Sequence, residues 1–82
     1  MKTHNLKLES KYFKAIKSGI KKFEIRKNDR DFKTGDFVFL EEIKGGKKTG
    51  NNLPLVRIKY VLHGGKYGLE EGYCIFSWVE VN

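Results

Sequence analysis

The sequence predicts a small α+β domain in which a strongly curved sheet or partial barrel of short strands is plugged by one helix. Short segments of alternating apolar and polar residues recur along the chain, and one early segment has apolar residues at helical spacing instead. Glycine-rich turns separate the segments. The chain has 82 residues, which is enough for one domain with a thin core, so a single domain is expected over residues 1–82.

The chain is expected to begin with a strand followed by the helix. Residues 3–8 alternate, with His4, Leu6 and Leu8 on one side, which predicts a first strand. Ser10 is a suitable N-cap for the helix, and Gly19 suits the position just after its end. About two helical turns lie between them, with these apolar residues at helical spacing: Tyr12, Phe13 and Ile16.

A second strand is predicted over residues 22–26, directly after the helix. Side chains alternate along a strand, so we expect Phe23 and Ile25 to enter the core. The charged residues of this strand should then share its other side: Lys22, Glu24 and Arg26. Such a charged row is compatible with a solvated strand face, an anion-binding groove or the floor of a catalytic pocket.

The loop after this strand should be built by side chains that bond their own backbone. Residues 28–31 are Asn-Asp-Arg-Asp, which is typical of a turn, and Phe32 is expected to anchor the loop.

The second half of the chain is predicted to contain three strands. The apolar runs at residues 37–40, 53–62 and 73–81 are rich in β-branched and aromatic residues. Residues 44–52 contain mainly Gly, Lys and Asn, so a mobile loop or hairpin tip is expected there. Residues 63–72 contain four glycines, which would let the backbone approach another group closely.

The predicted core consists mainly of aromatic and β-branched residues from these segments. Cys74 lies within the last strand, and a buried structural thiol is expected there rather than a nucleophile. The other core candidates are Phe13, Ile16, Phe23, Ile25, Phe37, Phe39, Val56, Ile58, Tyr60, Ile75 and Trp78.

The sequence favours a cytoplasmic protein without membrane segments. No apolar run approaches the roughly 20 residues that span a bilayer, and no export signal is visible at the N-terminus. The single cysteine cannot form an internal disulfide. No cofactor is expected. No metal is expected either, because His4, His63 and Cys74 lack the spacing of a ligand set.

The positive charge is concentrated in one part of the chain. The net charge is +7, and residues 11–34 hold nine cations against three acids, whereas residues 35–82 hold six of each. The excess therefore lies around the predicted helix and the strand after it. This distribution is typical of a surface that binds a polyanion, of which nucleic acid is the commonest, although a solubilising lysine-rich face would look the same.

A short motif spans the end of the helix and the second strand: Gly19-x-Lys21-x-x-Glu24-x-Arg26. It is followed by an Asp-Phe-Lys-Thr-Gly-Asp turn at residues 31–36 and a Gly-Gly-x-Tyr-Gly-Leu segment at residues 64–69. Together these segments resemble the ASCH domain superfamily, in particular its compact bacterial and phage branch known as DUF3850. The resemblance covers nearly the whole chain.

The resemblance implies a PUA-like fold, which is a small β-barrel of about five or six strands with one short helix packed at its opening. It also implies RNA or nucleotide binding in the basic cleft around the motif. The residues expected to contact nucleic acid are Lys21, Lys22, Glu24, Arg26, Lys27, Arg30, Lys66 and Tyr67. The cations would contact phosphates and Tyr67 would stack on a base, while Glu24 would accept hydrogen bonds from a base edge or orient its neighbours.

An enzymatic alternative follows from the same resemblance. One branch of the superfamily hydrolyses N4-acetylcytidine with a motif lysine, a threonine and a distant glutamate. Lys21 matches that lysine, but Glu24 occupies the threonine position and no counterpart of the glutamate is clear. Lys21 and Glu24 would be the catalytic pair if the protein is an amidohydrolase, and binding is favoured over catalysis.

Two further expectations concern partners. A monomer is favoured, and the cleft could alternatively serve as a protein-interaction surface.

Overall fold

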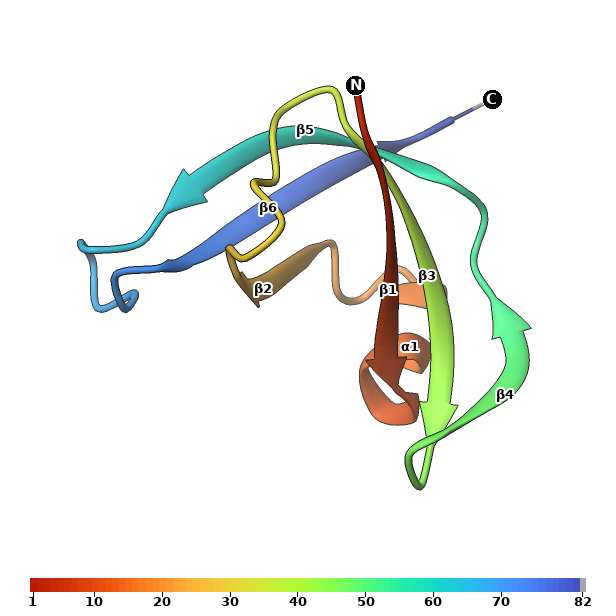
Figure 1. The fold of residues 1–82 in the computed structure, drawn as a ribbon. Helices are drawn as coiled ribbons and strands as arrows, with labels where there is room; N and C mark the ends of the chain where they lie inside the picture. Colours follow the sequence, from red (N-terminus) through yellow and green to blue (C-terminus); the bar gives the residue numbers. More distant parts are fainter. Residues whose placement is uncertain (82) are drawn as a thin grey trace.

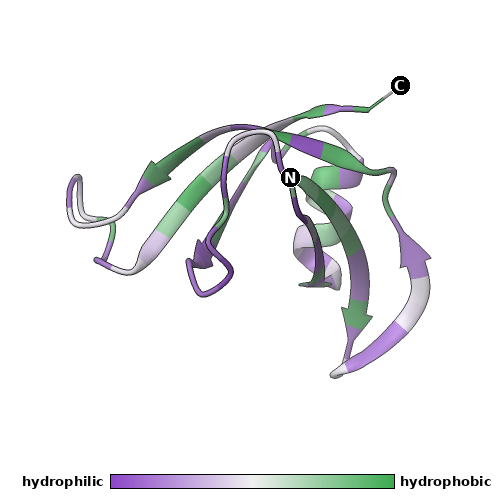
Figure 2. Cartoon of the chain, turned by 45° about the horizontal axis from the view of Figure 1, so that its top comes forward, coloured by the Kyte–Doolittle hydropathy of each residue, from purple (hydrophilic) through white to green (hydrophobic). Residues whose placement is uncertain are grey.

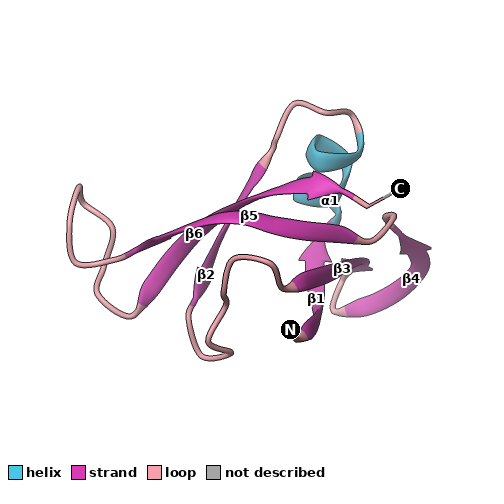
Figure 3. Cartoon of the chain, turned by 90° about the horizontal axis from the view of Figure 1, so that it is seen from above, coloured by secondary structure: helices cyan, strands magenta, loops and turns pink. Residues whose placement is uncertain are grey.

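The computed structural model describes residues 1–81 and contains six strands and one helix in a single bent sheet assembly (Figures 1 and 3). The elements are β1 (Thr3–Glu9), α1 (Ser10–Lys17), β2 (Phe23–Lys27), β3 (Phe37–Lys44), β4 (Lys47–Asn52), β5 (Val56–His63) and β6 (Tyr73–Glu80). The α+β class predicted from the sequence is therefore confirmed. Within these residues, no helix is both long enough and apolar enough to cross a bilayer.

The hydrogen-bonded order of the sheet is β1-β3-β5-β6-β2, and β4 pairs with β3 beside this path. β1 and β3 are parallel, and all the other pairs are antiparallel. The sheet is mixed and strongly bent, and within residues 1–81 its end strands, β1 and β2, share no backbone ladder. The predicted closure into a barrel is therefore not confirmed.

Helix α1 ends as the sequence predicts. Gly19 has φ +82° and follows the C-cap Ser18. The backbone N–H of Gly19 donates to Ile16, and that of Ile20 donates to Ala15, which is the Schellman arrangement. The start of the helix differs, because Glu9 is the N-cap and makes no side-chain capping bond. The hydroxyl of Ser10 instead donates to Glu42 on β3.

The core follows the alternation of β1, but the predicted inward faces of two other strands are wrong. His4, Leu6 and Leu8 of β1 point inward as expected. In the parallel ladder His4 lies opposite Val38, and Leu6 lies opposite Leu40. The buried residues of β3 are therefore Val38 and Leu40, and the predicted core residues Phe37 and Phe39 are only half-buried on the other face.

A β-bulge explains why Tyr60 is outside the core. Ile58 lies opposite Trp78, but Tyr60 lies opposite Ser77, so Lys59 is an extra residue in β5. The extra residue reverses the alternation and turns the Tyr60 side chain outward, where it is 62% exposed. The prediction that Tyr60 belongs to the core is therefore wrong, whereas Val56 and Ile58, before the bulge, are buried as predicted.

The remaining core predictions are confirmed for several residues. Phe13 and Cys74 are buried, Ile16 and Trp78 are partly buried against the core, and Ile75 is half-exposed. Burial raises the pKa of the Cys74 thiol. Among residues 1–81, the buried apolar residues are Leu6, Leu8, Phe13, Phe32, Val38, Leu40, Leu53, Val56, Ile58, Cys74 and Phe76.

Phe32 anchors its loop as expected. Its ring is 1% exposed and packs between the rings of His4 and Phe76, at centroid distances of 4.6 and 5.0 Å. The Asn28 side chain accepts a hydrogen bond from the Phe32 backbone N–H at 2.9 Å. Asn28 thus shapes the turn in the way its sequence position predicted.

A buried His4–Asp36 pair holds the same loop against β1. His4 Nε2 lies 2.8 Å from Asp36 Oδ2, and the backbone N–H groups of Lys2 and Lys33 donate to the same carboxylate. Burial alone would raise the pKa of Asp36. The hydrogen bonds from His4 and the two backbone groups outweigh burial, so this pKa lies below its ordinary value of 3.8.

Residues 44–52 form a hairpin, which was one of the two expectations for this segment, and not an irregular loop. They form the end of β3, a two-residue turn and strand β4. The turn is Gly45-Gly46, with φ +60° and +80°, as type I′ hairpins require. Polar contacts hold β4 in place, because Glu42 accepts hydrogen bonds from the side chains of Thr49 and Asn51.

The close backbone approach expected in the glycine-rich segment occurs within the segment itself. A Cβ on Gly64 would lie 1.9 Å from the Glu70 carbonyl oxygen. Gly64 therefore allows the β5–β6 loop to fold back on itself.

Glu42 makes a specific pH dependence of stability testable. Hydrogen bonds from Ser10, Asn51 and Thr49 lower its pKa from 4.5 to about 2. The folded pKa is below the unfolded one, so this stabilisation is complete above about pH 4.5 and is lost as the pH falls towards 2. Glu42→Gln should lower the melting temperature at pH 7, and its difference from the wild type should shrink over this range.

Thermal melts between pH 2 and 7, followed by circular dichroism, would measure this effect. Glu41→Gln is a matched control, because the neighbouring Glu41 makes one partly exposed ion pair with Lys48 at 3.4 Å. Parallel acid curves for Glu42→Gln and the wild type would contradict the role assigned to Glu42.

Candidate functional site

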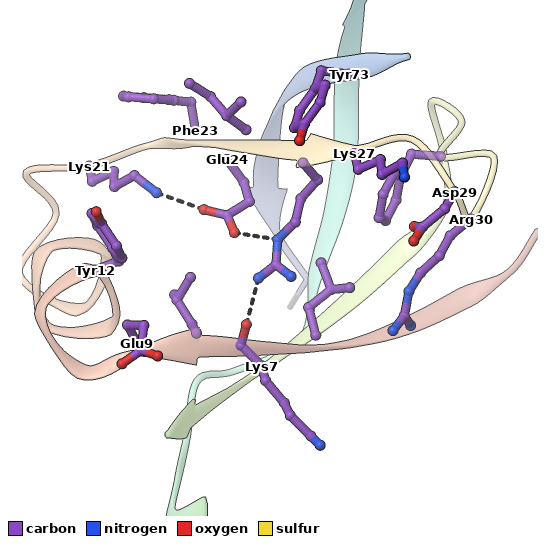
Figure 4. A pocket seen from close by; sticks show the side chains of 15 residues that line it. Lys7, Glu9, Tyr12, Lys21, Phe23, Glu24, Lys27, Asp29, Arg30 and Tyr73 are labelled. Atoms are coloured by element: carbon purple, nitrogen blue, oxygen red, sulfur yellow. Dashed lines mark hydrogen bonds and ion pairs between the residues drawn. The ribbon is translucent and has the colours of Figure 1, made fainter. Parts of the chain in front are cut away.

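A pocket of about 610 Å³ lies between the two end strands of the sheet, β1 and β2 (Figure 4). Helix α1 contributes Tyr12 to one end, and the loop after β2 contributes Asp29 and Arg30 to the other. This volume is in the range of small-molecule binding sites. The motif strand β2 forms one wall, so Glu24 and Arg26 of the predicted charged row lie in a concave site, whereas Lys22 does not line it.

Glu24 is the buried centre of this pocket. Its side chain is 5% exposed, and each of its two oxygens pairs with a different cation. Lys21 Nζ lies 2.6 Å from Oε1, and Arg26 Nε lies 2.6 Å from Oε2. A buried carboxylate is stable only with such partners.

The inward position of Glu24 reverses the predicted orientation of β2. Glu24 lies opposite Phe76 in the β2–β6 ladder, and Arg26 lies opposite Cys74, so their side chains share the face of these two buried residues. Phe23 and Ile25 point to the other side, where they are 43% and 49% exposed. The prediction that Phe23 and Ile25 enter the core is therefore wrong.

Lys21 is held between a carboxylate and two aromatic rings. Its ammonium lies 5.2 Å from the ring centroid of Tyr12 and 5.2 Å from that of Phe23. The Lys21 side chain is 18% exposed. It is therefore a positioned cation with one side open to the pocket, whereas an ordinary surface lysine is mobile.

Two arginines bridge the unpaired ends of the sheet. Arg26 donates from Nη2 to the backbone carbonyl of Lys7 at 2.6 Å, and Arg30 donates from Nη1 to that of Asn5 at 3.0 Å. Both carbonyls belong to β1, whereas Arg26 lies in β2 and Arg30 lies in the loop after β2, where Figure 4 labels it. These side-chain bonds connect β1 and β2 where no backbone ladder does.

The structure brings together five of the eight residues predicted to contact nucleic acid. These five line the pocket: Lys21, Glu24, Arg26, Lys27 and Arg30. The other three do not line it, since Lys22 precedes β2 with its side chain exposed, and Lys66 and Tyr67 lie in the β5–β6 loop. Tyr67 is 87% exposed and has φ +55°, which is uncommon for a residue other than glycine.

Sequence reasoning missed several residues of the pocket. The additional charged residues and tyrosines are Lys7, Glu9, Tyr12, Asp29 and Tyr73. Alternation placed Lys7 on the outward side of β1, but its distance from β2 could not be known from the sequence. The pocket lining therefore has five cations and three acids.

Among residues 1–81, no group of three or more His, Cys, Asp or Glu side chains is arranged to hold a metal ion.

The fold and the pocket define a class: a small basic domain with a bent mixed sheet and a cation-lined pocket between its end strands. The chain belongs to the DUF3850 family, because the family described as "Domain of unknown function (DUF3850)" matches residues 3–78. A relative from Escherichia phage P2, named "Uncharacterized 12.9 kDa protein in GpA 3'region", is 40% identical over 52 residues. This match covers 63% of the chain and 48% of the relative, so the chain spans about half of the relative's length.

Replacing Glu24 should destabilise the folded protein, because Lys21 and Arg26 lose their counter-charge. Glu24→Gln is expected to lower the free energy of unfolding by about 2 kcal/mol, because charged hydrogen bonds of partly buried groups are lost. Urea unfolding of the wild type and the variant would measure this difference in free energy. The control is Lys33→Gln, which breaks the exposed Lys33–Asp31 pair and should cost less than about 0.5 kcal/mol. Equal stability of both variants would contradict a structural role for Glu24.

Proposed function

We propose that the pocket between β1 and β2 binds single-stranded RNA or a nucleotide-sized part of it. The observation that carries the proposal is the buried Glu24 carboxylate held between Lys21 and Arg26 in a pocket with a cationic lining. Binding sites for bases need fixed polar groups and nearby cations for phosphate. The concentration of positive charge in residues 11–34 supports the same ligand class.

Each polar group retains capacity for a ligand. A carboxylate has about four acceptor sites, and Glu24 uses two of them within the protein. A guanidinium has five N–H donors, of which Arg26 uses two. Glu24 can therefore accept from the exocyclic amino group of a base, and Arg26 can donate to a phosphate or a carbonyl.

We also propose that the chain is a member of the ASCH superfamily with a PUA-like fold. The motif Gly19-x-Lys21-x-x-Glu24-x-Arg26, the helix before it and the bent sheet support this assignment. The arginine bonds from Arg26 and Arg30 to β1 supply a side-chain connection across the gap where a barrel would close.

Titration with labelled RNA tests the binding proposal. At low salt, single-stranded oligocytidylate should bind, and its affinity should fall steeply as salt is added. Lys21→Ala should weaken binding about tenfold, because it removes a positioned charged donor. Lys47→Ala is the matched control, since Lys47 is an exposed cation on β4 outside the pocket.

Circular dichroism should show that both variants are folded. The proposal is wrong if single-stranded, duplex and structured RNA all fail to associate with the wild type at low salt, or if Lys47→Ala and Lys21→Ala weaken binding equally.

A second candidate function is hydrolysis of an acylated nucleoside. The observation in its favour is the 2.6 Å contact between Lys21 Nζ and Glu24 Oε1 inside the pocket, which places a proton donor beside a potential base. Binding ranks above it, because both Glu24 oxygens already have cationic partners and, among residues 1–81, those that line the pocket include no threonine or serine.

Incubation with N4-acetylcytidine, followed by chromatography of cytidine, tests this candidate. Hydrolysis should exceed that of a Lys21→Ala variant if Lys21 takes part in catalysis. Equal product in both samples would exclude the activity for this substrate.

A further inference from the structure

The side of β2, β6 and β5 that faces away from the core has several exposed apolar side chains. We call this surface the outer face. Figure 2 shows hydrophobic stretches along β5 and β6, the two long strands that form most of the outer face. The exposed fractions are 43% for Phe23, 49% for Ile25, 62% for Tyr60 and 45% for Val79. The ladder positions that complete the surface are half-exposed: Leu62, Ile75 and Ser77.

The strand register places two aromatic rings on either side of a small residue. Phe23 lies opposite Ser77 in the β2–β6 ladder, and Tyr60 lies opposite the same Ser77 in the β5–β6 ladder. Neighbouring strands are about 5 Å apart, so the backbones that carry the two rings are about 10 Å apart. The short Ser77 side chain therefore stands between the two positions that carry rings.

The outer face is framed by cations and lacks acids. Its outward ladder positions on β2, β6 and β5 include two cations, Lys27 and Arg57, and no carboxylate. The exposed Lys59 lies at the bulge beside Tyr60. Two copies of the chain docked through this face would bring like charges together, whereas a polyanion would find complementary charge.

The outer face is continuous with the pocket across β2. Four residues belong to both surfaces, because they line the pocket and occupy outward ladder positions: Phe23, Ile25, Lys27 and Tyr73. An RNA strand that leaves the pocket across β2 therefore next reaches the row formed by Phe23, Ser77 and Tyr60. Exposed rings on a sheet with cations around them are typical of surfaces that bind single-stranded nucleic acid.

We propose that the outer face is a second binding surface for single-stranded RNA, on which a base beyond the first two nucleotides at the pocket stacks against Tyr60 and Phe23. This inference rests on the proposed function, since it extends the path of the same ligand. Lys59 and Arg57 contact the phosphates of this segment.

Binding of RNA of two lengths tests the proposal. Fluorescence anisotropy would compare labelled octacytidylate with labelled dicytidylate, using the wild type and Tyr60→Thr, which removes the ring and keeps a strand-forming residue. We expect Tyr60→Thr to weaken octacytidylate binding about tenfold, the effect of one stacking ring, and to leave dicytidylate binding unchanged. Tyr60→Phe should retain wild-type affinity for both.

Each other outcome separates this inference from the proposed function. If octacytidylate binds the wild type and Tyr60→Thr equally, the outer face is not used and the pocket proposal stands. If Tyr67→Ala loses affinity while Tyr60→Thr does not, the RNA leaves towards the β5–β6 loop and the inference is wrong. A wild-type dimer in sedimentation that Tyr60→Thr dissociates would assign the face to a second copy. Failure of all RNA to bind the wild type overturns both proposals.

Discussion

The Glu24 carboxylate, paired with Lys21 and Arg26, is the interaction on which the candidate site and its surroundings depend. It lies at the inner face of an edge strand, where a buried charge is tolerated only with hydrogen-bonded counter-charges. Arg26 extends the interaction by donating to the Lys7 carbonyl on β1. One network of side chains thus shapes the pocket and connects the two ends of the sheet.

This network also deals with the exposed edges of an open sheet. The end strands of a sheet have backbone groups without a ladder partner, and such groups favour pairing with other chains. On β1, the carbonyls of Asn5 and Lys7 accept bonds from Arg30 and Arg26. Arginine suits this position because its planar group has enough donors to bond a carbonyl, a carboxylate and a ligand together. The cations that would bind RNA are therefore also cations that hold the sheet ends together.

Local features of the chain could be predicted well where one residue determines the backbone. Gly19 ends the helix because its positive φ is accessible to glycine, and Asn28 shapes its turn through its own side chain. Strand β4 was not predicted, because its six residues are all polar or glycine. Hydrogen bonds from Thr49 and Asn51 to Glu42 on β3 hold it in place. The outward turn of Tyr60 depends on a bulge at Lys59, which becomes visible only once β5 is paired with β6.

For the site, the order of the residues is enough to predict which of them share a side of the motif strand. Period-two alternation groups Glu24 with Arg26 and separates them from Phe23 and Ile25 in any extended conformation. Which of the two groups faces inward depends on how β2 packs in the fold, because alternation is symmetrical and hydrophobicity favoured the wrong group. Pairing of Glu24 with Phe76 and of Arg26 with Cys74 fixes the charged side towards the interior, where the cations make its burial possible.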